Sequence, residues 1–171
     1  MGKILVLYFS ESGNTREMAN LVAEGAKSVK GSDVRLLSID KAKPEELLWA
    51  DGVAMGAPTY EGLLSWQAKK WWDEAVKAAW GKVFGKIGCA FSSSGGWGGG
   101  AELTCQSIMT IMINFGFMVF GVPDYTGPQM TLHYGSIAAG KPANEPQRES
   151  CRRLGKRLSE LVDLRRGNAG K

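Results

Sequence analysis

Cysteine and histidine are scarce in this chain. Its 171 residues include three cysteines and one histidine, and no two cysteines form a C-x-x-C pair. Because Cys89, Cys105 and Cys151 are odd in number and widely spaced, structural disulfides and a zinc site are disfavoured. We expect Cys89 in a core strand and the other two in helices, all as buried apolar thiols. The sequence offers no metal site and no catalytic histidine or nucleophile.

Long hydrophobic runs are also missing. The apolar run at the N-terminus, 4–9, spans six residues, follows a single lysine and lacks a small-residue cleavage site. It is therefore neither a signal peptide nor a membrane span, and we expect a cytoplasmic protein. Apolar residues make up 44% and charged residues 22%, which is ordinary for a globular protein. The length suits one domain over 3–166, followed by a frayed tail at 167–171.

The positive charge is confined to one end of the chain. The net charge is +4, but residues 146–171 alone carry +5, so the remaining residues carry −1. The basic stretch has no interleaved aromatics and no nucleic-acid motif. We interpret it as a solvated helix face and expect no nucleic-acid partner, although an anionic partner stays open.

Apolar periodicity predicts five strands that alternate with five helices, which is typical of a doubly wound parallel α/β sheet. The strands are expected at 4–9, 34–39, 52–57, 85–91 and 117–122, and the helices at 15–30, 44–49, 65–79, 101–115 and from about 145. The 101–115 helix is apolar over more than one stripe, which leaves open a second buried face against another subunit. Residues 123–146 are expected as a long, ordered excursion.

The turn after the first strand suits an anion. Ser10, Ser12, Asn14 and Thr15 supply hydroxyl or amide donors, and Gly13 permits a positive φ. The helix that follows points its free N–H groups back at this turn. A Walker A loop is excluded because Gly-Lys-Ser/Thr is missing, so a phosphomonoester held by neutral donors is favoured. The alternative is a polar turn with Thr15 as the helix N-cap.

Two later loops favour a ligand. The first, 58–64, follows the third strand and carries Tyr60, which can stack on a planar ligand or pack on its neighbours. The second, 92–100, follows the fourth strand and contains five glycines and Trp97 among nine residues. A lone aromatic on such a tip favours stacking on a flat ligand. A Rossmann dinucleotide site is excluded because these glycines do not follow the first strand.

In a doubly wound sheet, the loops after strands one, three and four border one crevice. A phosphate turn and two aromatic residues in that crevice describe FMN. Here the Ser-Glu-Ser-Gly-Asn-Thr turn of residues 10–15 resembles the phosphate loop of the flavodoxin-like flavoproteins, and the likeness covers about residues 3–165. The resemblance implies a five-stranded sheet of order 2-1-3-4-5 with helices on both faces. It also implies that Tyr60 and Trp97 flank the isoalloxazine ring.

The resemblance extends to a full set of cofactor-binding positions. They are Ser10, Ser12, Gly13, Asn14, Thr15, Pro58, Thr59, Tyr60, Gly62, Ser93, Ser94, Gly95, Trp97 and Gly98.

Other segments are similar to the quinone-reductase branch of this family, the WrbA type. They include Gly56–Tyr60, Phe91–Gly95 and Tyr134–Gly140. By this likeness Trp80, Phe115 and Tyr134 would shape a substrate pocket. Two features depart from that branch: the first loop is of the flavodoxin type, and Phe115 stands where the branch carries a histidine.

Three functions are therefore compared. The first is an FMN-binding redox protein that carries electrons to a redox partner protein. The second is a WrbA-type NAD(P)H:quinone oxidoreductase, acting on a quinone with NAD(P)H as reductant. The third, an FMN-free scaffold, requires Tyr60 and Trp97 to have no ligand and is disfavoured. The apolar 101–115 helix and the family likeness leave a homodimer or homotetramer open.

Overall fold

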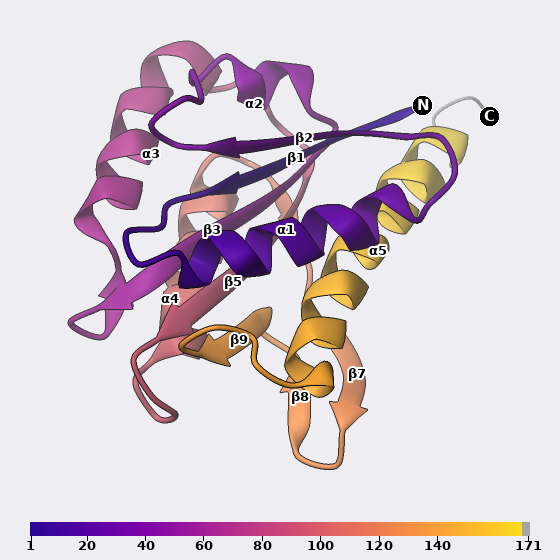
Figure 1. Cartoon of the computed structure of the whole chain (residues 1–171). Helices are drawn as coiled ribbons and strands as arrows, with labels where there is room; N and C mark the ends of the chain where they lie inside the picture. The colour runs from indigo at the N-terminus through magenta and orange to yellow at the C-terminus, as the bar shows by residue number, and fades with distance from the viewer. Residues whose placement is uncertain (169–171) are drawn as a thin grey trace.

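A parallel sheet runs through the middle of the molecule, with helices on both of its faces (Figure 1). The computed structural model describes residues 1–168. The sheet order is β2-β1-β3-β5-β6, with β4 antiparallel to β3 and β9 parallel to β5. Counting only the main strands, this is the predicted order 2-1-3-4-5.

The strands are β1 (Gly2–Tyr8), β2 (Ser32–Ser38), β3 (Gly52–Tyr60), β4 (Leu63–Leu64), β5 (Ile87–Ser94), β6 (Met118–Val119), β7 (Val122–Gly127), β8 (Met130–Leu132) and β9 (Ser136–Ala139). The helices are α1 (Asn14–Lys27), α2 (Glu46–Trp49), α3 (Trp66–Ala79), α4 (Ala101–Asn114) and α5 (Glu145–Asn168).

The first strand is apolar throughout because both of its faces are covered. Successive side chains of a strand point to opposite faces. Leu5 and Leu7 therefore join the core beneath α3 and α4, whereas Ile4 and Val6 join the core beneath α1 and α5. All four side chains are fully buried. The two cores hold the carboxyl ends of β1, β3 and β5 in a fixed arrangement.

The predicted fifth strand, 117–122, is wrong as one continuous element. Along the edge of β5 that faces away from β3, the short strand β6 pairs with the start of β5, and β9 pairs with its end. Between them the chain leaves the sheet and forms the β7–β8 hairpin, which lies beside the first turns of α5 (Figure 1). Gly121 and Gly135 permit this detour, because a Cβ at either position would meet a backbone carbonyl oxygen within 2.1 Å.

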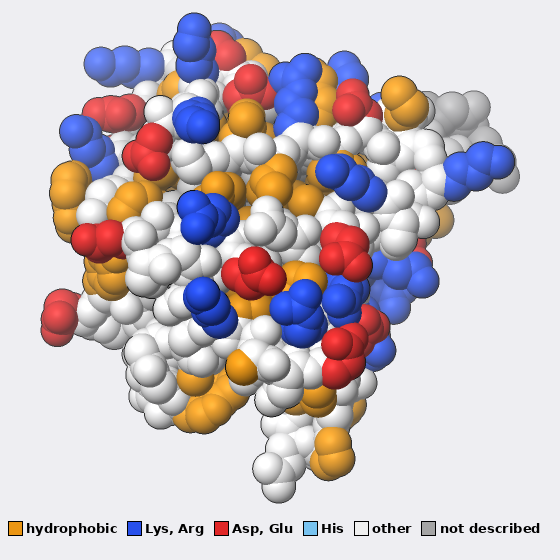
Figure 2. Space-filling view, in the orientation of Figure 1, with side chains coloured by type: hydrophobic (Ala, Val, Ile, Leu, Met, Phe, Trp, Pro, Cys, Tyr) orange, Lys and Arg blue, Asp and Glu red, His pale blue; other side chains and the backbone are white. Residues whose placement is uncertain are grey.

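The basic C-terminal helix presents a charged surface to solvent, as predicted, and the structure adds ion pairs to it. Arg152 of α5 pairs with Glu24 of α1 at 2.9 Å and with Glu145 at 2.8 Å. Arg166, near the far end of α5, pairs with Asp51 at 2.8 Å. Figure 2 shows positive and negative side chains interspersed over this face. Acidic side chains therefore interrupt the positive charge on the face that Figure 2 shows.

Other expectations can be compared directly with the structure. The three cysteines are buried and free, in β5, α4 and α5 as predicted. Helix α5 extends to Asn168, and the rest of the predicted frayed tail, 169–171, lies outside the described residues. Helix α4 exposes Leu103 and Ile113, so its second apolar face is uncovered within this chain. Among residues 1–168, no helix is long and apolar enough to cross a membrane.

Candidate functional site

The first predicted loop connects β1 to α1. Gly13 is the N-cap residue of α1 with φ 92°, and no side chain caps the helix. The first backbone hydrogen bond of the helix runs from the N–H of Glu17 to the carbonyl oxygen of Gly13, at 3.0 Å. The N–H groups before it are the free donors that every helix start presents. The N–H of Gly13 itself donates to Ser10 Oγ at 3.1 Å. Such an uncapped helix start can hold an anion.

The second predicted loop is a tight hairpin. Strand β3 continues through Tyr60, and β4 returns antiparallel to it. Glu61 and Gly62 form the two-residue turn, with φ 48° and 83°. Positive φ at both central residues is the mark of a type I′ hairpin turn. Among residues 1–168, Glu61 is the one non-glycine residue with positive φ. A Cβ on Gly62 would meet nothing within 4 Å, so this turn borders open space.

The third predicted loop follows β5. Its glycines Gly95, Gly96 and Gly98 also border open space, because a Cβ on any of them would meet nothing within 4 Å. Trp97 stands between them with 59% of its surface exposed. A large apolar side chain left in water next to open backbone suits a planar ligand. Trp97 is therefore exposed beside open backbone, and its stacking role stays a prediction.

Buried hydroxyl groups join the three loops. Thr15 Oγ1 and Ser93 Oγ share a hydrogen bond at 2.9 Å, which connects the first loop to the end of β5. Thr59 Oγ1 shares one with Ser92 Oγ at 3.0 Å and accepts another from Thr104 Oγ1 at 2.9 Å. The hydroxyls of Thr15, Thr59 and Ser93 therefore hold the loops together, and the cofactor-binding role of these residues stays a prediction. Ser94 Oγ likewise donates to the carbonyl oxygen of Gly96 at 2.7 Å.

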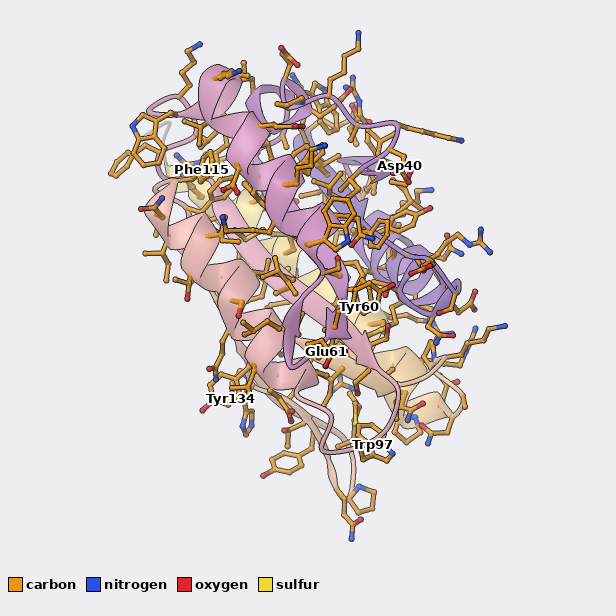
Figure 3. All side chains as sticks on the ribbon, turned by 90° about the vertical axis from the view of Figure 1, so that its left-hand side faces the viewer. Asp40, Tyr60, Glu61, Trp97, Phe115 and Tyr134 are labelled. Atoms are coloured by element: carbon orange, nitrogen blue, oxygen red, sulfur yellow. The ribbon has the colours of Figure 1, made fainter. Side chains whose placement is uncertain are left out.

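Tyr60 lies within this assembly. Its ring packs against the core beneath α3 and α4, and its hydroxyl donates to Glu11 Oε2 at 2.6 Å. Desolvation raises the pKa of Tyr60 to about 12, with further contributions from the hydrogen bond to Glu11 and the negative charge of that carboxylate. Figure 3 shows Tyr60, Glu61 and Trp97 at the same edge of the sheet. The structure therefore brings together the three loops that the sequence assigned to one crevice.

Of the residues suggested for a substrate pocket, Phe115 lies far from Trp97, and Trp80 lies beside Phe115. Trp80 and Phe115 contact each other edge to face, with ring centroids 5.5 Å apart. Phe115 is also packed against Trp72 and is 6% exposed, which makes it a core residue. In Figure 3 it lies at the far end of α4 from Trp97. Tyr134 is half exposed before β9 and lies apart from Phe115 in the same view.

The structure adds residues that sequence reasoning missed. Glu11 binds Tyr60, Thr104 binds Thr59, and Gly100 packs against the backbone of Gly62. A groove of about 690 Å³ also opens beside Trp97, on the side of the β7–β8 hairpin. Its walls are Trp97, Glu102, residues 127–131, Ile137, Asn144, Pro146 and Gln147. The spacing of these residues in the sequence gave no sign of these contacts, because each joins segments far apart along the chain.

Metal-ligating side chains do not gather at this crevice. Within residues 1–168, no group of three or more His, Cys, Asp or Glu side chains is placed to hold a metal ion. The three loops present backbone N–H groups, short polar side chains, two aromatic rings and the carboxylate of Glu11.

Comparison with known proteins agrees with this geometry. The flavodoxin family model matches residues 6–162. A flavodoxin from Aquifex aeolicus is 57% identical over 96% of this chain and 89% of its own length. An NAD(P)H dehydrogenase (quinone) from Chromohalobacter salexigens is 32% identical over 95% of this chain and 98% of its own. The solved structure of a flavodoxin from the domain Archaea superposes with a TM-score of 0.76 at 31% identity, over 94% of this chain and 99% of that one. The chain thus belongs to the flavodoxin family.

Proposed function

We propose that this chain binds FMN between its three loops and carries electrons to and from redox partner proteins through that flavin. The observation that carries the proposal is the convergence of the uncapped start of α1 with Tyr60 and Trp97 at one edge of the sheet. Membership of the flavodoxin family implies a flavin cofactor. FMN is the flavin that this crevice fits, because it joins a planar ring to a phosphate.

The residues present fit the two ends of FMN. The free N–H groups at the start of α1, with Ser10, Ser12 and Asn14, would hold the phosphate without a lysine. Open space beside Gly62, Gly95, Gly96 and Gly98 leaves room for a ring to approach the backbone of both later loops. Tyr60 and Trp97 would flank that ring.

Bound FMN supplies the redox chemistry. The protein binds the cofactor, orients it and keeps water from part of its surface. The buried hydroxyl contacts among Thr15, Thr59, Ser92 and Ser93 serve the orientation, since they fix the three loops relative to one another. Pro58 is buried at the end of β3 and fixes the strand that carries Thr59 and Tyr60. No catalytic side chain is required for this role.

Flavin binding is tested on the apoprotein by quenching of FMN fluorescence. We expect one FMN per chain with a dissociation constant below about 1 µM, and an affinity about fivefold lower in Trp97→Ala, since one stacked aromatic contributes roughly 1 kcal/mol. Trp66→Ala is the matched control, because Trp66 is 66% exposed and lies on α3 outside the three loops. A protein that binds no FMN, or a Trp97→Ala variant that binds like Trp66→Ala, contradicts the proposal.

Quinone reduction is the second candidate function. The Chromohalobacter salexigens relative and the groove beside Trp97 favour it, whereas the packing of Phe115 in the core argues against the expected acceptor pocket. Incubation of the FMN-loaded protein with NADH or NADPH and a naphthoquinone separates the two functions. We expect no nucleotide oxidation above the protein-free rate. Steady turnover would instead assign the chain to the quinone oxidoreductases.

A further inference from the structure

A side-chain hydrogen bond joins the first and second loops. Its donor is the hydroxyl of Tyr60, at the end of β3, and its acceptor is Oε2 of Glu11, in the turn after β1. The two residues are 49 positions apart in the sequence, and their oxygens are 2.6 Å apart. A hydrogen bond to an ionised carboxylate is stronger than one between neutral groups. The contact therefore restrains two loops that are far apart along the chain.

Tyr60 leads directly into the Glu61–Gly62 turn. Glu61 has φ 48°, a left-handed conformation that is sterically unfavourable for an L-residue. Such a conformation persists only where neighbouring contacts fix the backbone on both sides. On one side of the turn is the bond from Tyr60 to Glu11. On the other, Gly100 approaches so closely that a Cβ there would lie 3.3 Å from the carbonyl oxygen of Gly62.

Glu11 is unusual in its loop. The other side chains of residues 10–15 are neutral, and the loop lies at the positive end of α1. A carboxylate there repels a phosphate that binds to the same loop, so phosphate binding alone gives no reason for it. What the carboxylate gains is the hydrogen bond from Tyr60. The presence of a glutamate at position 11 is therefore explained by its contact with Tyr60 of the second loop.

We propose that Glu11 is a positioning residue for the flavin site: it fixes Tyr60 and the Glu61–Gly62 turn, and its charge reduces the preference of the site for FMN over riboflavin. The inference rests on the proposed FMN function. Glu11 touches Tyr60 in this structure and acts on the flavin ring only through it, whereas its charge acts on the phosphate directly.

Affinities of the apoprotein for riboflavin and FMN test the proposal. Riboflavin has no phosphate, so it reports the positioning role alone. We expect Glu11→Ala and Tyr60→Phe each to weaken riboflavin binding about fivefold, since an exposed hydrogen bond to a charged group is worth roughly 1 kcal/mol. The double variant should bind no more weakly than either single variant, because both remove the same contact. Losses that multiply to about 25-fold in the double variant would overturn the proposal.

Glu11→Gln is the conservative variant. Its amide oxygen can still accept the hydrogen bond of Tyr60, so riboflavin affinity should stay near the wild-type value. Its preference for FMN over riboflavin should rise about threefold and fall again as salt is added, because one negative charge leaves the phosphate loop. An unchanged preference, or a rise that salt does not affect, contradicts the charge effect.

A measurement without flavin tests the contact itself. Alkaline titration of tyrosine absorbance should show one hydroxyl with a pKa of about 12 in the wild type. Tyr60→Phe should remove that titration, and Glu11→Ala should lower its pKa, leaving the effect of burial. Failure of the wild type to bind any flavin overturns the proposed function together with this inference. Wild-type riboflavin affinity in both single variants overturns the inference alone.

Discussion

The two faces of the sheet are covered in opposite ways. On one face, α1 and α5 approach so closely that a Cβ on Gly25 would lie 1.8 Å from the carbonyl oxygen of Arg152. A Cβ on Gly155 would lie 1.9 Å from that of Val22. On the other face, large side chains fill the space between α3 and the sheet. Trp72 is 1% exposed and contacts Phe115 and Phe117 edge to face.

The two faces are therefore sensitive to different substitutions. Where backbones touch, an added methyl group has no space and the helices must move apart. Where an indole fills the gap, removal of atoms leaves a cavity that the neighbours fill only in part. Helices α3 and α4 also expose the large apolar side chains of Trp66, Leu103 and Ile113.

The largest effect is expected from Gly155→Ala. The new Cβ would overlap the backbone of α1, which cannot rotate away as a flexible side chain can. We expect the free energy of unfolding to fall by about 4 kcal/mol or more, as for other severe core overpacking. Urea unfolding followed by circular dichroism measures it.

Gly167→Ala is the matched control for this prediction. Gly167 lies on the same helix, and a Cβ there would meet nothing within 4 Å. We expect a change within about 0.5 kcal/mol, as for most surface substitutions. A Gly155→Ala variant as stable as this control would show that α1 and α5 are not in backbone contact.

Trp72→Ala is the corresponding test of the aromatic face. Loss of a buried indole should lower the free energy of unfolding by about 3–4 kcal/mol. Trp72→Phe should cost less, partly because the buried Nε1 of Trp72 has no hydrogen-bond partner in the described structure. Trp66→Ala, on the same helix but 66% exposed, should change stability by at most about 0.5 kcal/mol. Equal losses in Trp72→Ala and Trp66→Ala would contradict the packing of this face.

Sequence patterns predicted both faces because helical and strand periodicity are local signals. They also placed the three loops, since each follows a strand with recognisable apolar character. The split of the fifth strand was not predictable in this way. Strand β9, Ser136–Ala139, is short and built from small residues, and it is paired because β5 offers it a free edge. That edge exists only after the rest of the sheet has formed.

The candidate site shows the same limit. Thr15 was predicted from its chemistry as a donor to a ligand, but a hydroxyl binds whichever partner the fold brings within reach. In the structure Thr15 Oγ1 shares a hydrogen bond with Ser93 Oγ at 2.9 Å. The role of Glu11 was missed for the same reason, because nothing in residues 10–15 indicates that Tyr60 lies within hydrogen-bond distance. The position of each loop could be predicted from neighbouring residues. The contacts between loops could not, because they join residues far apart along the chain.

The smallest expected effect is a change in stability at alkaline pH. It compares the two faces of the sheet because each face contains a buried thiol. Burial raises the pKa of Cys105 of α4 far above its ordinary value of 9.0. Burial also raises the pKa of Cys151 of α5, but only to about 11, because hydrogen bonds from Ser136 and Ser150 and the charges of Arg152 and Arg148 favour the thiolate.

Above pH 9 the unfolded chain has lost protons that the folded chain still holds, so the free energy of unfolding must fall as pH rises. Each buried thiol should contribute a slope of about 1.4 kcal/mol per pH unit. For Cys151 that slope should end near pH 11, where the folded thiol ionises, whereas for Cys105 it should continue.

Urea unfolding at pH 8, 9, 10, 11 and 11.5 should therefore show a shallower fall in both Cys105→Ala and Cys151→Ala than in the wild type. Above pH 11 the Cys151→Ala slope should match the wild-type slope again. If both variants kept the wild-type slope from pH 9 to 11, the two thiols would be open to water in the folded chain, and neither face would be as closely covered as the structure has it.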